Sequence, residues 1–502
     1  MLDFVLDFWK RHPALLIGLL SLLGTACALA CHPIYMGVLI CLLFPFVRKR
    51  CFTLPFFLAI GACVFTFTTA SFRITPTQLP QDKIEGKGLF HIENLSILAS
   101  PFNRSYCYKG TLKCFESKDG KLYSNLPCSV FHPLKHPPKA DKDYTIEGAL
   151  TQKKENLFCL KPKKNTQWKS IAGTYSFAQL RFDAKKKVAS YVKQHISNSA
   201  SASFLSALIT GDVDERSLRL DFGRLGLQHL LAISGFHFSF FALVLNILLR
   251  PFFPFTQRNL ALMASLAAYF CFLGNAPSIL RAFTVICIYL VAQLIKRRTS
   301  GLNALGAALT LELLLDPYVV TQLSFQLSFL CTLALLLFYP LVHHFVCYLL
   351  PERTSSELHQ MPLLDQHGYI LSALIRKSLS VNVAVCLFSI PVLLHIFHKF
   401  PLLSLVYNLF FPFCVSLSLL LLCCALILSM LVPPLSSLLH TLNSTWTTFL
   451  LQLTSNPPSY FDVVLRTNAI SFPIVIGGLL MLFFIGVYFS SWKRSMIFAE
   501  GR

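Results

Sequence analysis

The chain has 502 residues, of which 54% are hydrophobic and only 13% are charged, and its mean hydropathy is +0.59. Soluble globular domains carry about 25% charged residues, so this composition excludes an ordinary soluble enzyme and indicates a polytopic membrane protein. Lys and Arg number 44 against 23 Asp and Glu, and the net charge of +21 predicts contact with an anionic partner, either lipid or nucleic acid.

Residues 1–72 are predicted to hold the first membrane spans, because a helix needs about 20 apolar residues to cross a bilayer. Three apolar runs occupy residues 13–30, 34–47 and 54–72. Basic residues precede the first run and separate the second from the third, and the positive-inside rule places both clusters in the cytoplasm. The N-terminus is therefore expected inside. Ala28-Leu-Ala30 resembles a signal-peptide cleavage site, but the second apolar run follows at once, which favours a span.

Residues 73–200 contain no long apolar run and carry 22 Lys and Arg against ten Asp and Glu, a local net charge of +12. Short alternating segments between Gly, Pro, Asn and Lys clusters predict a small β-barrel or sandwich at residues 73–175. An amphipathic helical connector is expected at residues 176–228. Crossing three spans places this basic domain outside the cytoplasm, and long translocated domains are exempt from the positive-inside count.

Apolar runs resume after the connector and define a membrane domain at residues 229–492, followed by a basic tail at 493–502. The runs are 229–249, 260–273, 278–295, 302–315, 319–342, 379–397, 403–431, 435–453 and 470–490. Counting crossings predicts about twelve membrane segments, with every flanking basic cluster and both termini in the cytoplasm. The shorter runs are equally compatible with re-entrant or half-helices.

Polar residues interrupt one apolar run in the middle of the chain. His229 and His237 flank Ser234 and Gly235 within Gly226-Leu-Gln-His-Leu-Leu-Ala-Ile-Ser-Gly-Phe-His237. A membrane helix that breaks at glycine leaves backbone amides unpaired, and the next helix N-terminus can direct them at an anion. The alternative is a glycine packing notch beside a histidine that bonds a neighbouring carbonyl.

Arg281 lies near the predicted outer boundary of a span. An ionisable side chain inside a span is a candidate functional residue. Arg281 either lines a hydrated path as a phosphate contact, pairs with Glu312 or Asp316, or extends outward to water. Gln326 and Ser328 follow in a later span, where interhelical hydrogen bonding is the alternative to a ligand contact.

Motifs for nucleotide and metal chemistry do not occur. The sequence has no Gly-x-x-x-x-Gly-Lys-[Ser/Thr] motif, so an ATP-driven step requires a partner protein. It has no Cys-x-x-Cys or His-x-His pair, and the adjacent His343 and His344 fall in a predicted cytoplasmic loop, residues 343–377, where solvation is expected. We therefore predict no metal site, no cofactor and no enzymatic activity.

Basic charge in the outer domain is concentrated at residues 151–200, which carry 11 Lys and Arg against two Asp and Glu. Lysines beside aromatic rings suit single-stranded nucleic acid, because charge follows the backbone while rings stack on bases. The run Lys185–Lys187 fits either nucleic acid or an anchor to anionic lipid. The predicted DNA-binding residues are Lys153, Lys154, Phe158, Lys161, Lys163, Lys164 and Trp168.

Four of the 17 cysteines lie in the outer domain. Because this domain is expected on the oxidising side of the membrane, one or two disulfides are predicted, and two bridges allow three pairings. The cysteines concerned are Cys107, Cys114, Cys128 and Cys159.

Several motifs in order resemble the ComEC family of competence proteins, which bring transforming DNA through the bacterial inner membrane. The motifs are Ala207-Leu-Ile-Thr-Gly-Asp212, Gly226 to His237, Ser278-Ile-Leu-Arg-Ala282, Asp316-Pro317, Phe325-Gln-Leu-Ser-Phe329, and Pro391 followed by Pro401 to Pro412 with Asn408. The resemblance is strong over about residues 175–415 and loose over the N-terminal spans and outer domain.

The resemblance implies an OB-fold for the outer domain and a passage for one DNA strand past the broken helix. By carry-over at matching positions, the channel residues are His229, Ser234, Gly235, His237, Arg281, Gln326 and Ser328. Many family members end in a metallo-β-lactamase-like domain thought to degrade the other strand. This chain ends soon after its last predicted span, so we expect a short form that relies on a separate nuclease.

The leading hypothesis is an inner-membrane channel for uptake of single-stranded DNA during natural transformation, served by a cytoplasmic ATP-driven motor or single-strand binder. The sequence leaves a homo-oligomer open. One alternative is an exporter of an anionic lipid or polymer, which Arg281 and the basic domain also fit. A second is an intramembrane serine protease with Ser234 as nucleophile and His237 as base. A base so close to its nucleophile on a broken helix is poorly aligned, which disfavours the protease.

Overall fold

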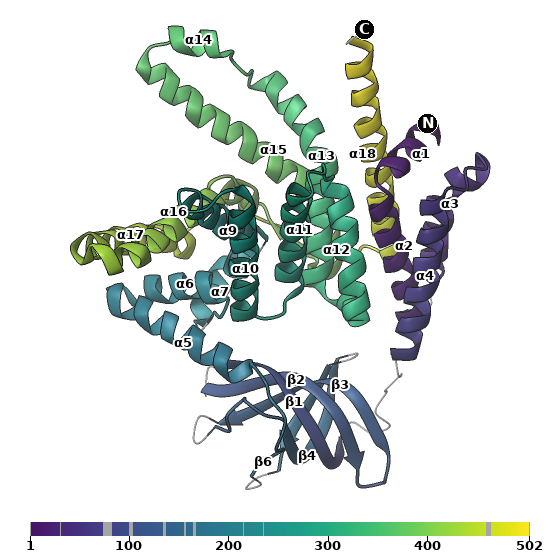
Figure 1. Ribbon diagram of the computed structural model, residues 1–502, viewed down its shortest axis with the longest axis vertical. Coiled ribbons are helices and arrows are strands. Elements are labelled where there is room, and N and C mark those ends of the chain that lie inside the picture. The colour runs from purple at the N-terminus through teal and green to yellow at the C-terminus, as the bar shows by residue number, and fades with distance from the viewer. Residues whose placement is uncertain are drawn as a thin grey trace.

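The computed structural model consists of a β-barrel and a larger helical body (Figure 1). It describes residues 2–500 except 31, 74–82, 100–103, 134–136, 155–156, 164–166, 214, 234 and 458–462. The barrel lies at one end of the molecule, and both chain ends lie at the opposite end (Figure 1). In sequence, the barrel is inserted between the fourth and fifth helices.

Five strands form the barrel: β1 (Ile84–Ala99), β2 (Arg104–Ser117), β3 (Leu122–Pro133), β4 (Tyr144–Lys154) and β5 (Leu157–Pro162). β2 pairs antiparallel with β1 and β3, and β4 pairs antiparallel with β1 and β5. β3 and β5 are parallel. The β1–β4 pairing closes the sheet, and the short β6 (Lys169–Ser170) adds to β4. The small β-barrel expected from the sequence is confirmed.

Alternation along the strands fills the barrel with apolar side chains. The most deeply buried, each at most 2% exposed, include Phe90, Tyr108, Phe115, Leu150 and Phe158. At Gly110 on β2, an added Cβ would lie 1.9 Å from the carbonyl oxygen of His91 on β1. Only glycine permits this approach, which occurs beside the β1 irregularity between Ile92 and Asn94.

Before the barrel the chain forms α1 (Leu2–Arg11), α2 (Pro13–Leu29), α3 (Pro33–Arg48) and α4 (Leu54–Arg73). After it come α5 (Ala178–His195), α6 (Ser199–Thr210), α7 (Arg216–Arg224), α8 (Gln228–Leu231), α9 (Gly235–Leu249), α10 (Phe255–Leu273), α11 (Pro277–Leu294) and α12 (Gly301–Leu315). The rest are η1 (Pro317–Thr321), α13 (Leu323–Leu349), α14 (Ser355–Gln360), α15 (Leu363–Phe397), β7 (Lys399–Pro401), α16 (Leu403–Leu431), α17 (Pro433–Ser455), β8 (Val464–Arg466) and α18 (Phe472–Glu500).

One sequence prediction about these helices needs correction. The predicted loop at residues 343–377 is largely helical, because α13 continues to Leu349 and α15 already begins at Leu363. The connector is helical, and α7 within it buries Leu218 and Phe222 while most of its other residues are exposed, whereas nine of the 12 residues of α6 are buried. Helix α6 packs against α5, α16 and α17.

Among the residues that the structure describes, six helices are long and apolar enough to cross a membrane: residues 54–72, 277–294, 323–349, 363–397, 403–431 and 472–490. The pair α1 and α2, bent by 97°, is a seventh candidate. The structure thus supports a polytopic helical membrane protein, but not about twelve full-length spans. The apolar helices α3, α6, α9 and α12 have 10–17 residues, too few at about 1.5 Å per residue for about 30 Å of hydrocarbon.

The N-terminal helices are tightly attached to α12. An added Cβ at Gly18 on α2 would lie 2.6 Å from the carbonyl oxygen of Gly306, and one at Gly306 would lie 2.2 Å from that of Ala14. Small residues allow helix backbones to approach this closely in membranes. The amide of Ala14 also donates to Asn303 at 3.2 Å. This contact fixes the position of α12.

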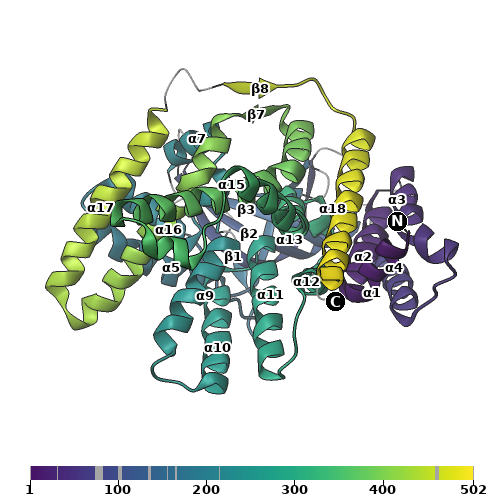
Figure 2. The same ribbon diagram turned by 90° about the horizontal axis from the view of Figure 1, so that it is seen from above.

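The helical body has a centre and two flanks when seen from above (Figure 2). Helices α1 to α4 form one flank, and α16 and α17 form the other. Helices α9 to α13 lie between them and carry most of the residues predicted for the channel. The same arrangement is seen from the side in Figure 1.

Candidate functional site

The predicted helix break is present between α8 and α9. Helix α8 ends at Leu231, and α9 starts at Gly235. Ser234 lies outside the described residues. The hydroxyl of Ser278, in the first turn of α11, donates to the carbonyl of Ile233 at 3.1 Å. α11 therefore supplies a hydrogen bond to a carbonyl that lies outside both helices.

Arg281 on α11 is directed toward α13. Its Nε donates to the hydroxyl of Ser328 at 2.8 Å, and a second guanidinium nitrogen donates to Thr332. Its guanidinium carbon lies 5.9 Å from the ring centre of Phe329. An added Cβ at Gly235 would lie 2.8 Å from Nη2. The structure thus brings together Gly235, Arg281 and Ser328, and it does not show Arg281 extending outward to water.

Glu312 on α12 is a buried carboxyl group near this cation. Its exposed fraction is 1%, and neither of its oxygens has a hydrogen-bond partner among the described residues. The charge of Arg281 acts on it through space. Asp316, the other partner suggested by sequence, instead accepts a hydrogen bond from the amide of Tyr318 at 2.9 Å and caps η1. A buried acid beside an arginine inside the helical body is a functional candidate.

The remaining predicted channel residues do not join this contact. Gln326 is exposed, and its amide nitrogen donates to the carbonyl of Val320 at 2.8 Å. His237 is 3% exposed near the start of α9, and His229 is exposed on α8. Thr332 was missed, although it follows Ser328 by four residues and therefore shares its helix face.

The aromatic residues predicted to stack on DNA are structural. Phe158 is 2% exposed in the barrel core, so its ring has no face for a base and the stacking prediction is wrong for it. Trp168 is half-buried, with ring centres of Tyr108, His132 and Tyr144 at 5.0, 5.7 and 5.7 Å. Phe158 lies on a strand and Trp168 lies in a loop, and both rings pack against other side chains of the barrel core.

The lysines predicted to bind DNA or lipid differ in their exposure. Lys161 and Lys163 are exposed, whereas Lys164 and the side chains of Lys153 and Lys154 lie outside the described residues. Lys185 is buried on α5 and forms an ion pair with Asp212 at 3.2 Å. Burial lowers the pKa of Lys185, and Asp212 opposes this effect. Lys185 is thus removed from the surface run, while Lys186 and Lys187 remain exposed.

A buried acid, Asp143, contacts His91 and Lys113 in the barrel. Asp143 is 1% exposed, and its oxygens lie 2.6 Å from His91 Nδ1 and 2.8 Å from Lys113 Nζ. Burial raises the pKa of Asp143, but the hydrogen bonds and charges of Lys113 and His91 together hold it below its ordinary value. Asp143 therefore carries its charge inside the barrel wall.

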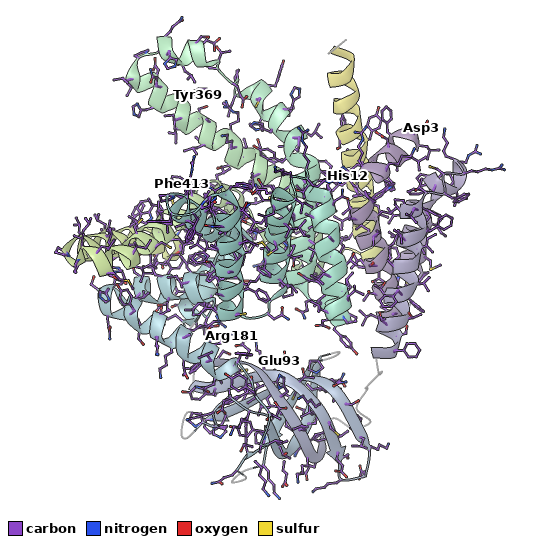
Figure 3. The ribbon with its side chains drawn as sticks, in the orientation of Figure 1. Asp3, His12, Glu93, Arg181, Tyr369 and Phe413 are labelled. Carbon is purple, nitrogen blue, oxygen red and sulfur yellow. The ribbon has the colours of Figure 1, made fainter. Side chains whose placement is uncertain are left out.

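Arg181 on α5 joins the barrel to the helical body. Its Nη1 donates to the carbonyl of Glu93 on β1, and its Nε donates to the carbonyl of Cys271 on α10, both at 2.9 Å. Gly274, with φ of +95°, lies directly against the guanidinium. Figure 3 shows Arg181 and Glu93 at the junction. One side chain thus bonds both the barrel and α10.

Within the described part of the chain, Cys114, Cys128 and Cys159 form no disulfide, contrary to the disulfide prediction. Cys107, Cys128 and Cys159 are buried within strands, and Cys114 is exposed. Burial raises the pKa of Cys128 to about 12. A thiol in such surroundings packs as a small apolar side chain, which explains why these cysteines need no bridge.

Comparison with known proteins identifies the chain's family. A family model described as competence protein matches residues 208–494, more than half of the chain. The chain belongs to the competence protein family. The matched segment contains α9, α11 and α13, and hence the contact between Gly235, Arg281 and Ser328. The resemblance noted in the sequence is confirmed.

This competence-family chain is also similar to ComE operon protein 3 of Bacillus subtilis (strain 168). The two are 28% identical over 314 residues, which is 59% of this chain and 36% of that protein. The chain thus matches little more than a third of the length of that relative. No solved structure matches the chain.

Proposed function

We propose that this competence-family protein forms the path by which single-stranded DNA crosses the inner membrane during natural transformation. The observation that carries the proposal is the contact of Gly235, Arg281 and Ser328 beside a helix break, inside the family-matched segment. A phosphate backbone needs positive charge and hydrogen-bond donors along a membrane path. Arg281 supplies both, and its hydroxyl partners can be exchanged for phosphate oxygens.

The barrel is proposed as the receptor for DNA. Its closed strand order β1-β2-β3-β5-β4 is compatible with an OB-fold, an architecture that binds oligonucleotides. Because Phe158 and Trp168 pack within the barrel, capture is proposed to rely on phosphates and on exposed lysines such as Lys161. Such binding weakens steeply as salt rises.

The orientation proposed places the barrel outside the cell and both termini in the cytoplasm. The termini and the α14 region lie at the end of the molecule opposite the barrel (Figure 1). Lys10, Arg11 and the run Arg48–Arg50 lie near the N-terminal end, which suits the positive-inside rule. The short helices α9 and α12 are proposed as half-helices that line the path. A cytoplasmic motor or single-strand binder and a separate nuclease complete the proposed system.

An uptake assay tests the proposal in cells that carry one gene copy. Labelled DNA protected from external nuclease is measured for Arg281→Gln, with membrane abundance followed by immunoblot. We expect uptake at least about tenfold below wild type, since a lost charged contact of about 1.5 kcal/mol or more has that effect. The matched control is Arg297→Gln, at an exposed arginine just past α11, which should leave uptake unchanged.

Lipid and surface-polymer analysis of the same strains separates the exporter alternative. Wild-type uptake in Arg281→Gln would contradict the proposed path. An altered envelope with normal uptake would favour export of an anionic lipid or polymer. For the receptor step, the full chain in detergent is titrated with fluorescent single-stranded DNA at several salt concentrations. Lys161→Glu should weaken binding more than Lys121→Glu, an exposed lysine in the β2–β3 turn. Binding that ignores salt would contradict phosphate capture.

A further inference from the structure

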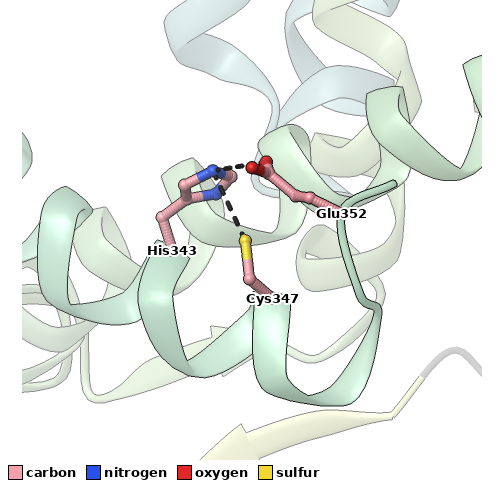
Figure 4. A group of neighbouring side chains, drawn as sticks. All are labelled: His343, Cys347 and Glu352. Carbon is pink, nitrogen blue, oxygen red and sulfur yellow. Dashed lines mark hydrogen bonds and ion pairs between the residues drawn. The ribbon is translucent and has the colours of Figure 1, made fainter. Parts of the chain in front are cut away.

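Three potential metal ligands meet where α13 ends, away from the contact at Arg281. His343 and Cys347 are four residues apart on α13 and share a face of the helix. Glu352 follows just past the helix end, and its carboxylate turns back toward them (Figure 4). His343 Nε2 lies 3.6 Å from Cys347 Sγ and 3.4 Å from Glu352 Oε1. All three ligand atoms lie within 4.8 Å of one another.

These distances fit the coordination geometry of Zn²⁺. Zinc binds imidazole nitrogen and carboxylate oxygen at about 2.0 to 2.2 Å and thiolate sulfur at about 2.3 Å, usually in a tetrahedron. A tetrahedral angle then places nitrogen about 3.6 Å from sulfur and about 3.4 Å from oxygen. The observed separations of 3.6 and 3.4 Å are the same within the spread of such sites. Three protein ligands leave a fourth position for water.

The surroundings of His343 orient its Nε2 toward the other two ligands. Ser380 on α15 donates its hydroxyl hydrogen to the carbonyl of Arg376 at 2.8 Å. The Ser380 oxygen, 3.1 Å from His343 Nδ1, is therefore the acceptor for the Nδ1 hydrogen. The Nε2 lone pair then faces Cys347 and Glu352. Metal-bound histidines are commonly held by such a hydrogen bond from the other ring nitrogen.

The neighbouring arginine completes the arrangement. Arg376 Nη2 lies 3.4 Å from Glu352 Oε1, and its Nη1 donates to the carbonyls of Leu350 and Pro351 at 3.1 Å. Arg376 thus holds both the carboxylate and the turn that carries it. A ligating carboxylate usually has such a hydrogen-bond donor behind it.

We propose that His343, Cys347 and Glu352 bind Zn²⁺ and that the ion fixes the end of α13 to the turn leading into α14. The site lies at the end of the helical body opposite the barrel (Figure 1). The proposal differs from the sequence-based expectation of no metal site; the structure itself shows that His343 lies on α13 and not in a loop. The sequence signal was the spacing of His343 and Cys347 on one helix face, while the position of Glu352 depends on the fold.

Cobalt spectroscopy on the full chain in detergent tests the site. Co²⁺ substitutes for Zn²⁺ and gives an intense thiolate-to-metal absorption band when a cysteine binds it. We expect one Co²⁺ per chain, a thiolate band, and displacement of the band by one equivalent of Zn²⁺. Cys347→Ser should abolish the band, whereas Cys41→Ser, at an exposed thiol on α3, should leave it intact.

The remaining variants separate metal binding from a simple hydrogen-bonded cluster. His343→Ala and Glu352→Gln should each raise the dissociation constant for Zn²⁺ at least tenfold, and Ser380→Ala should raise it about tenfold. His344→Ala, at the exposed neighbouring histidine, should match wild type. Absence of a thiolate band in the wild-type chain, or a band that persists in Cys347→Ser, would overturn the proposal without depending on how the variants fold.

Discussion

Removing the positive charge of Arg281 should destabilise the helical body chiefly because Arg281 bonds two hydroxyl groups on α13, and in addition because it lies near the buried carboxyl of Glu312. In Arg281→Gln the charge-assisted bonds to Ser328 and Thr332 are lost, each worth about 1.5 to 3 kcal/mol. A buried group that stays ionised without its partner typically costs about 3 to 5 kcal/mol, but the carboxyl of Glu312 can take up a proton, which limits this cost. These effects overlap, so we expect a net loss of about 3 kcal/mol.

A double-mutant cycle isolates the through-space term. Glu312→Gln removes the carboxyl charge, so Arg281→Gln should be less destabilising in its presence, by about 1 kcal/mol or more. Each protein is heated at the same rate in detergent micelles, and apparent melting temperatures are compared. Arg297→Gln combined with Glu312→Gln serves as the control pair and should be additive. If the Arg281 pair is also additive, the buried-charge reasoning fails.

Three further perturbations follow from the same contacts. Gly235→Val should reduce DNA uptake several-fold by displacing Arg281. Gly477→Ala should leave uptake unchanged, because an added Cβ there meets nothing within 4 Å. Equal uptake in both variants would contradict the close approach of Gly235 to Arg281. Because the folded pKa of Asp143 is lowered, its stabilising effect is complete above its unfolded value of about 3.9 and is lost as pH falls through the folded value. Wild type should therefore lose melting temperature below about pH 4, and Asp143→Asn should show a smaller acid loss; identical acid profiles would refute this. Arg181→Ala should speed proteolytic release of the barrel, and an unchanged cleavage rate would show that other contacts seat it.

The positions of helices could be predicted because each apolar run is much longer than the uncertainty in where it begins and ends. The run predicted at Leu403–Leu431 is helix α16 with the same ends. The number of spans could not be predicted, since α9 and α12 are mainly apolar, despite His237 and Glu312, but are too short to cross unaided. Hydropathy reports that a segment avoids water, and it does not report whether lipid or protein surrounds it.

Side-chain roles were harder to predict than elements. Arg281 sits near a helix start, and its sequence neighbours do not show whether it points to water or to Ser328 on α13. The position of Phe158 next to lysines suggested a DNA contact, although strand alternation directs its ring into the barrel. Lys185 shows the same limit, because Asp212, its partner, lies 27 positions farther along the chain. Tertiary contacts decide such cases.

The glycine pair of α2 and α12 bears on how this protein can be recombined. Gly18 belongs to the region before the family-matched segment, and Gly306 lies within it. A methyl group added at Gly18 or at Gly306 would collide with the backbone of the opposite helix. The two regions are therefore packed backbone against backbone. Chimaeras that join foreign N-terminal helices to this membrane domain should assemble only when the donor also has a glycine where its helix crosses α12.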